Sequence, residues 1–222
     1  MLKSTTKRTG AFILGAVIVL LALVGVATLI SLSARGVNSL LGDEAKKAEY
    51  EQFLSSVVRN DPDPFDDVSQ AEPSQLIDCV LWSILQSNME TGSYEIVEFE
   101  NSAGFQIPKA DVEARFAELF GVTQGITHTT VDGGDYVFTY DQNKEVYLVP
   151  VTGIAPLYTP KVTDIQRKSR TIVLTVGYIP ATEYALDDSG NVITPEPNKY
   201  RKITLRTTND GYYISAIQQV AN

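Results

Sequence analysis

Residues 200–217 read YRKITLRTTNDGYYISAI, and this stretch decides the fold class. Apolar and polar side chains alternate on both sides of Asn209-Asp210-Gly211. A period of two is typical of a strand with one buried face, and such a turn between two alternating runs indicates a β-hairpin. We therefore expect Ile203 and Leu205 on the buried face. The polar face opposite them is expected to carry Lys202, Thr204 and Arg206.

The period of two extends upstream to about residue 135. Further strands are expected at 136–140, 146–148, 162–166 and 172–178. Turns are expected at 141–144 and 167–170, and a loop tip at 187–191. Two shorter extended segments, 94–100 and 105–107, come earlier in the chain. The second half of the chain therefore predicts an antiparallel meander.

Helical patterns occur only before residue 121. Residues 43–60 carry an apolar stripe, and residues 73–87 are apolar on nearly every side, which predicts a central buried helix. Ser69 and Glu72 have the spacing of a capping box for that central helix. A third helix is expected at 110–120, with Gly121 as its C-terminal cap. The stripe of the first helix consists of Tyr50, Phe53, Leu54, Val57 and Val58.

The order of these elements, closing with Gly211-Tyr212-Tyr213-Ile214, resembles the nuclear transport factor 2-like superfamily over residues 69–222. The resemblance implies an α+β fold in which helices pack on a curved antiparallel sheet that forms a cone. The superfamily includes small-molecule enzymes, ligand pockets and structural modules, so the fold does not fix the function. Several membrane-anchored bacterial envelope and conjugation proteins are similar in layout.

Residues 11–32 form a run of 22 residues without a charged side chain. A helix of that length spans about 33 Å, which matches the hydrocarbon core of a bilayer. We expect one transmembrane helix here, binding the lipid bilayer as a permanent anchor. Ser31 and Ser33 are small enough for a weak signal-peptidase site, so a cleaved signal is the alternative.

Basic residues flank this run on both sides. Lys3, Lys7 and Arg8 precede it, and Arg35, Lys46 and Lys47 follow it. Because the preceding tail is short and wholly basic, we expect the N-terminus in the cytoplasm and the large domain outside. The reverse orientation, with a cytoplasmic regulatory head, is the alternative. The expected organisation is a tail (1–10), a membrane helix (11–32), a stalk helix and Asp/Pro linker (33–68) and a soluble domain (69–222).

The charge is unevenly distributed. Residues 36–135 hold 19 acidic and 5 basic side chains, whereas residues 136–222 hold 8 and 9. An acidic surface repels nucleic acid, so no nucleic-acid partner is expected. The single cysteine excludes an intramolecular disulfide, and no Asn-x-Ser/Thr sequon is present. Both features are consistent with a bacterial cell envelope.

No catalytic constellation stands out. His128 is the only histidine, and a His/Asp pair of the superfamily type would require Asp132, Asp135 or Asp164 beside it. Without such a partner, His128 is an ordinary surface or core residue. Cys79 lies in the apolar helix, where a thiol behaves as a small hydrophobic group rather than as a nucleophile.

Acidic residues gather in the Asp/Pro segment, at Asp61, Asp63, Asp66 and Asp67. The prolines interrupt the spacing of a calcium loop, so a solvated linker is the preferred interpretation. The segment 187–191 is a weaker candidate for calcium. The sequence therefore predicts no catalytic residue, cofactor or metal site.

Basic residues gather in the C-terminal strands, where a polar outer sheet face is the simplest interpretation. An anionic wall polymer, or the acidic half of a neighbouring copy, is the alternative partner for them. They are Lys161, Arg167, Lys168, Arg170, Lys199, Arg201, Lys202 and Arg206.

Two functional hypotheses follow. The first is a non-enzymatic, single-pass membrane module whose extracytoplasmic head binds or scaffolds a protein partner, or associates with itself. The second is a small-ligand-binding or enzymatic domain with a pocket inside the curved sheet, lined by Tyr136, Phe138 and Trp82. A scaffold should have an interior filled by apolar side chains, whereas an enzyme needs a concave pocket with converging polar groups.

Overall fold

The computed structural model describes residues 37–99, 102–151 and 154–220. The expected tail and membrane helix, residues 1–32, lie outside the described residues. Within the described part, no helix has both the length and the apolar character needed to cross a bilayer.

The chain divides into two compact units, Met1–Lys46 and Lys47–Asn222. The described residues of the first unit are helical. The second unit contains residues 47–68, which the sequence analysis assigned to a stalk and linker. The folded domain therefore begins at Lys47 and not at the predicted position, residue 69.

Helix α2 (Val37–Asn60) includes the predicted apolar stripe. Tyr50, Leu54, Val57 and Val58 are buried, and Phe53 is partly buried against the same core. The i, i+4, i+7, i+8 spacing of the buried residues places them on one face of the helix, which explains why this part of α2 belongs to the domain.

The Asp/Pro segment after α2 packs on the domain. Asp61, which has a positive φ of 48°, ends the helix. Phe65 is buried and exchanges two backbone hydrogen bonds with Ile217, at 2.8 and 2.9 Å. The interpretation as a solvated linker is therefore wrong for Phe65, because this residue covers a strand edge. A short 3-10 helix, η1 (Val68–Gln70), follows.

Helix α3 (Pro73–Thr91) is the predicted central helix, with eight buried residues. The predicted capping box is not formed: Glu72 is the N-cap without a side-chain hydrogen bond. Ser69 instead bonds to Asp67 within η1. Helix α4 (Lys109–Phe120) ends as predicted at Gly121, whose φ of 71° is left-handed.

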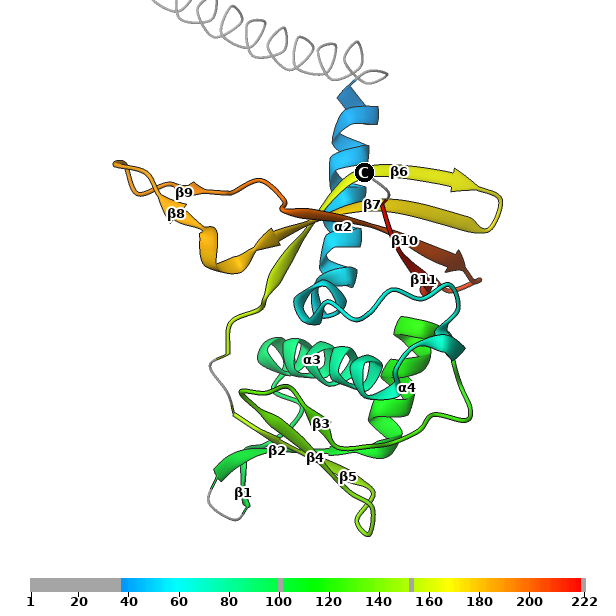
Figure 1. Cartoon of the computed structure of the whole chain (residues 1–222), viewed down its shortest axis with the longest axis vertical. Coiled ribbons are helices and arrows are strands. Elements are labelled where there is room, and N and C mark those ends of the chain that lie inside the picture. Colours follow the sequence, from blue (N-terminus) through cyan, green and yellow to red (C-terminus); the bar gives the residue numbers. More distant parts are fainter. Residues whose placement is uncertain (1–36, 100–101, 152–153, 221–222) are drawn as a thin grey trace, which may run out of the picture. The chain divides into compact units, whose positions relative to one another are not determined.

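The described strands form two main antiparallel sheets and a small ribbon (Figure 1). The first sheet has the order β1-β2-β5-β4-β3, and α3 and α4 pack on it. Its strands are β1 (Val97–Phe99), β2 (Ser102–Pro108), β3 (Val131–Asp132), β4 (Val137–Asp141) and β5 (Val146–Pro150).

The second sheet has the order β11-β10-β7-β6. Its strands are β6 (Tyr158–Lys168), β7 (Thr171–Pro180), β10 (Lys199–Thr207) and β11 (Tyr212–Gln219). The connection from β7 to β10 carries a 3-10 helix, η2 (Ala181–Glu183), and the two-stranded ribbon of β8 (Ala185–Leu186) and β9 (Val192–Ile193).

The chain is α+β, as predicted, but its strands do not lie in one continuous curved sheet. Strand β5 pairs with β2 on one side and with β4 on the other. Both edges of β5 are thus occupied, and β6 pairs with β7 in a separate sheet. Buried side chains from both sheets and the three described α-helices nevertheless form one hydrophobic core cluster, whose members include Leu54, Ile77, Phe138, Leu174 and Ile217.

Candidate functional site

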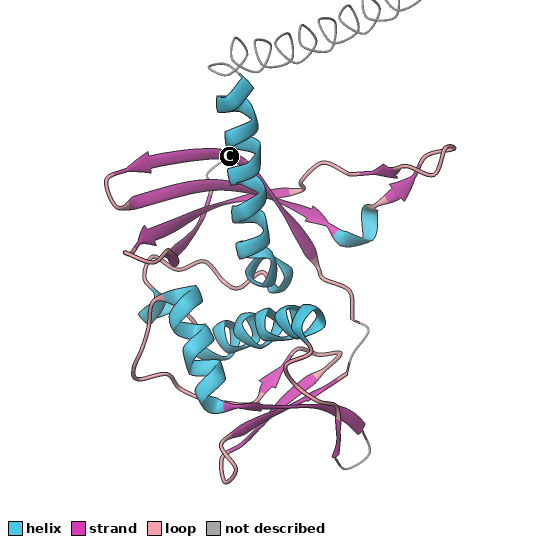
Figure 2. Cartoon of the chain, turned by 180° about the vertical axis from the view of Figure 1, so that it is seen from behind, coloured by secondary structure: helices cyan, strands magenta, loops and turns pink. Residues whose placement is uncertain are grey.

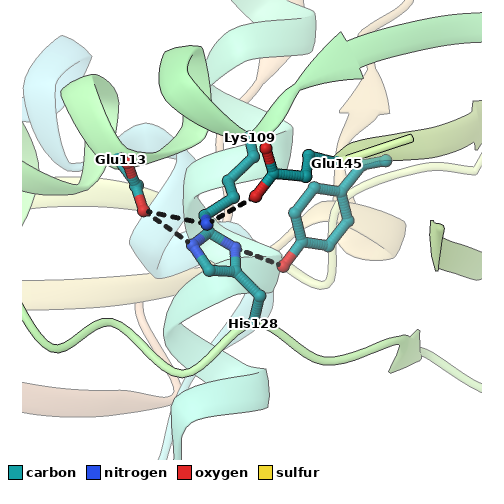
Figure 3. Close-up of polar contacts among 5 residues, drawn as sticks. Lys109, Glu113, His128 and Glu145 are labelled. Carbon is teal, nitrogen blue, oxygen red and sulfur yellow. Dashed lines mark hydrogen bonds and ion pairs between the residues drawn. The ribbon is translucent and has the colours of Figure 1, made fainter. Parts of the chain in front are cut away.

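His128 lies in the loop between α4 and β3, with a side chain that is only 7% exposed. Its Nδ1 is 3.0 Å from the hydroxyl of Tyr147, and its Nε2 is 3.2 Å from a carboxylate oxygen of Glu113 (Figure 3). The ring also stacks on Tyr140, with 5.2 Å between the ring centroids. The only histidine of the chain is therefore held from three sides.

The hydrogen bonds assign the tautomer of this histidine. The ionised carboxylate of Glu113 can only accept, so in the neutral imidazole the ring proton lies on Nε2 and is donated to Glu113. Nδ1 then accepts a hydrogen bond from the hydroxyl of Tyr147. Because both ring nitrogens have partners, His128 would have to break a hydrogen bond before it could act as a general base.

An ion-paired lysine lies beside the histidine. Lys109 Nζ lies 3.0 Å from Glu145 and 4.0 Å from Glu113, so the two carboxylates share one ammonium (Figure 3). Lys109, His128 and Glu145 line an open surface depression together with Tyr140. Its charges are already paired, and no group of three metal-ligating side chains occurs within the described residues. The arrangement fits a structural clasp between α4 and the β4–β5 hairpin.

The acidic partner of His128 is not one of those expected from the sequence. Asp132 accepts a hydrogen bond from the backbone of Gly134, and Asp164 accepts one from Gln166. Glu113 takes the place beside the imidazole because α4 carries it there. In the sequence, the spacing of four residues between Lys109 and Glu113 indicates only an ion pair along the helix. It does not indicate a contact between Glu113 and His128.

A half-buried carboxylate was not anticipated from the sequence. Asp78, on the otherwise apolar α3, accepts a hydrogen bond from the hydroxyl of Tyr136, with distances of 2.8 and 3.0 Å to its two oxygens. Trp82 donates its indole N–H to the same hydroxyl at 3.1 Å. The guanidinium of Arg59 lies 3.5 Å above the Trp82 ring. This network connects α2, α3 and the residue that precedes β4.

Burial dominates the electrostatics of this network. Desolvation raises the pKa of Asp78 to about 6, although the Tyr136 hydrogen bond and the Arg59 charge act in the opposite direction. Burial also raises the pKa of Tyr136, which therefore remains a donor. A carboxyl group with such a pKa can take up a proton under mildly acidic conditions.

The three aromatic residues proposed as a pocket lining pack against one another. The Tyr136 and Phe138 rings lie 4.6 Å apart, and Trp82 contacts both at 5.4 and 5.6 Å. Phe138 is fully buried. These side chains fill space between α3 and β4 instead of enclosing a ligand.

Cys79 is fully buried, and desolvation raises the pKa of its thiol. A nucleophile requires the thiolate form and access to a substrate, and the environment of Cys79 opposes both.

The clustered aspartates do not converge on a common point. Asp61 pairs with Lys199, Asp66 accepts a hydrogen bond from Gln218, and Asp67 caps η1. A calcium site needs several oxygens directed at one position, which these partners prevent. Gln75 likewise engages Asp63: its side-chain amide donates to the Asp63 carboxylate and accepts a hydrogen bond from the Asp63 backbone N–H.

Asp187 is held within its own turn. Its carboxylate accepts hydrogen bonds from the backbone of Ser189 and Asn191, both at 2.8 Å. The residue shapes the tip of the β8–β9 ribbon.

The basic strands have the predicted polar outer face. Ile203 and Leu205 are fully buried, whereas Lys202 and Arg206 on β10 are exposed. Lys199 is instead directed to Asp61, and Lys161 lies 3.7 Å from Glu196. The predicted basic cluster is therefore divided between internal ion pairs and an exposed face.

The β8–β9 ribbon exposes apolar side chains. Leu186 is 68% exposed, Val192 is 64% exposed and Ile193 is 51% exposed. The ribbon extends beyond the end of the four-stranded sheet in both views (Figures 1 and 2). From the sequence, only a loop tip was expected at 187–191. The apolar pairs on both sides of it, Ala185-Leu186 and Val192-Ile193, are the sequence signal for the ribbon.

A surface groove of about 820 Å³ lies where α2, α3, α4 and the β10–β11 turn meet. Its walls carry Glu90, Glu118 and Asp210 against Arg115. Arg115 already pairs with Glu118 at 3.0 Å. The groove is therefore acidic and wide open.

Comparison with known proteins adds no family. No protein-family model matches the chain, and no curated protein is significantly similar to it. Any functional conclusion therefore depends on the geometry described above and on the sequence.

Proposed function

We propose that this chain is a single-pass membrane protein of a bacterial cell envelope whose extracytoplasmic head binds a protein partner. The apolar run at 11–32 supplies the anchor, and residues 47–222 supply the head. The resemblance to the nuclear transport factor 2-like superfamily belongs to the same proposal, at the level of element order and not of one continuous sheet.

One observation carries the protein-binding role: the exposed apolar side chains of the β8–β9 ribbon. A two-stranded ribbon gains little stability by itself, and placing Leu186, Val192 and Ile193 in water contributes nothing to folding. Clustered exposed apolar residues of this kind are typical of surfaces that become buried in a complex. The ribbon therefore serves as a docking arm, here defined as residues 184–193.

The alternative function, a ligand pocket inside the sheet, has less support. Trp82, Tyr136 and Phe138 pack together, and both nitrogens of His128 are engaged. The acidic groove is one place where a small cationic ligand would fit.

Site-specific photocrosslinking in cells tests the docking arm. A photoreactive residue at Leu186 should give one discrete crosslinked protein product. The matched control is Met89, which is 88% exposed near the end of α3 and should give none. Equal labelling from both positions, or no product from Leu186, would contradict the proposal.

Protease treatment of intact spheroplasts tests the topology. An extracytoplasmic head should be degraded without lysis, whereas a head on the cytoplasmic side should be fully protected until the membrane is opened. Release of the intact head by washing would contradict the permanent anchor.

A further inference from the structure

The docking arm combines apolar side chains with negative charge. From Tyr184 to Ile193 the arm contains two acidic residues and no basic one, and Glu183 and Glu196 flank it. Glu196 pairs with Lys161, and Asp187 is engaged in its own turn. Asp188, at the tip, is exposed. Such a surface would be repelled by an anionic membrane, so its partner should be both cationic and partly apolar.

A surface of that description exists on the same chain, on the outer face of the four-stranded sheet. Alternation along β7 places Val173 opposite the buried Ile172 and Leu174. Thr204 of β10 pairs with Val173, and Lys202 and Arg206 lie two residues away on either side of Thr204. These outer-face residues form a small apolar centre flanked by two cationic side chains, Lys202 and Arg206, while Asp164 of β6 lies beside Thr175 on the same face.

The adjoining β6–β7 turn adds to this cationic border. Lys168 pairs with Thr171, which in turn pairs with Arg206 on the other side of β7. Lys168, Arg170 and Arg206 are all exposed. We call the outer-face residues Lys168, Arg170, Val173, Lys202, Thr204 and Arg206 the basic patch.

The arm and the basic patch lie toward opposite ends of the sheet. Strand β7 runs from the β6–β7 turn at Thr171 to Pro180, from which η2 leads into the arm, and ten residues of strand cover about 33 Å. Both views show the ribbon and the β6–β7 turn pointing in opposite directions (Figures 1 and 2). An arm therefore reaches a basic patch on another molecule more readily than its own.

We infer that the partner of the docking arm is a second copy of this chain, and that the acidic, apolar arm of one copy docks on the basic patch of the next. This contact uses two different surfaces, so it is heterologous and generates a ring or an open row of subunits. The inference rests on the proposed membrane anchor and protein-binding role. A small contact of this kind is weak, and confinement of all copies to one membrane raises their effective concentration.

Cysteine crosslinking of the full chain in its membrane tests this inference. Cys79 is fully buried, so it provides little background. Cells would express one copy with Ser189→Cys, at the arm tip, and a second copy with Thr175→Cys, next to Lys202 in the register. A short bismaleimide should give a dimer from the mixture and not from either variant alone.

A matched control replaces the patch cysteine by Gln52→Cys, on exposed surface at the acidic groove. This mixture should yield no dimer. Equal dimer from the Gln52→Cys and Thr175→Cys mixtures would mean random collision and would overturn the inference.

Charge reversal provides a second, independent test of the contact. Asp188→Lys, or Lys202→Glu, should lower the dimer yield about three- to tenfold, because each replaces attraction by repulsion. Both substitutions in every copy should restore it. Asp210→Lys, on the β10–β11 turn, is the matched control and should leave the yield unchanged.

The two proposals can fail separately. If the mixed-copy dimer is absent while Leu186 still crosslinks to a different protein, self-association is overturned and the protein-binding role stands. If Leu186 captures no protein at all, both are overturned.

Discussion

The carboxylate of Asp78 accepts a hydrogen bond from the hydroxyl of Tyr136, a residue 58 positions further along the chain, at 2.8 Å. The contact places a half-buried ionisable group between the end of α2 and β4. Desolvation raises the pKa of this group to about 6, so protonation and folding are coupled.

Asp78 makes the domain more stable in mild acid. Because the folded pKa of about 6 is higher than the unfolded value of about 3.9, ionisation costs more in the folded state. The destabilisation is absent below the unfolded pKa and fully present above the folded pKa. We expect this group alone to make the free energy of unfolding about 1.4 kcal/mol larger at pH 5 than at pH 7.

Asp78→Asn should remove that increment while keeping an acceptor for Tyr136. Urea denaturation of the full chain in detergent at both pH values measures it. Asp188→Asn, on the exposed arm tip, should retain the parental pH dependence. An unchanged pH dependence in Asp78→Asn would contradict the assignment.

Removal of one hydroxyl group, that of Tyr147 beside His128, should lower the stability of the domain. Tyr147→Phe removes the donor to Nδ1 and leaves a buried imidazole nitrogen without a partner. We expect a loss of about 1–3 kcal/mol in the free energy of unfolding. Tyr140→Phe keeps the ring stacking on His128 and should change stability by less than about 0.5 kcal/mol. Equal effects of both variants would show that the hydrogen bond carries no weight.

Gly121 is required for two reasons, and a paired substitution separates them. Its φ of 71° is left-handed, and an added Cβ would lie 2.5 Å from the ring of Tyr213. Gly92 caps α3 with a similar φ of 62° but has nothing within 4 Å of an added Cβ. Gly92→Ala should therefore cost about 1 kcal/mol, and Gly121→Ala clearly more. Thermal unfolding compares them, and equal losses would contradict the predicted clash.

Phe65 determines whether the Asp/Pro segment belongs to the domain. Its side chain is 5% exposed, and its backbone pairs with Ile217 on β11. Phe65→Ala should lower the free energy of unfolding by about 3–5 kcal/mol. Pro64→Ala, at the exposed neighbouring position, should change it by less than about 1 kcal/mol. A loss below 1 kcal/mol for Phe65→Ala would restore the interpretation as a linker.

Elements defined by neighbouring residues were predicted well. Helix α4 ends at Gly121, and β10 and β11 flank the turn at Asn209-Asp210-Gly211. In both cases the required conformation depends on residues within a few positions of one another. The capping box at Ser69 failed because α3 begins only at Pro73, with Glu72 as its N-cap, while Ser69 lies in η1, which Asp67 caps.

Long-range partners were not predictable in the same way. Glu113 is 15 positions from His128, and nothing in the spacing distinguished it from Asp132 or Asp135. The division into two sheets also depends on pairing between β2 and β5, strands that are separated by α4 and two further strands. An alternating pattern shows which side of a strand is buried but not which strand lies beside it.

By itself, the sequence determined the helices, the main strands and the buried face of β10, because periodicity and turn chemistry act locally. The tertiary structure alone decided that Phe65 closes a strand edge, that Glu113 and Tyr147 hold His128, and that the half-buried Asp78 accepts a hydrogen bond from Tyr136. These relationships arise only when distant segments are packed into one core, where desolvation and shape select the partners.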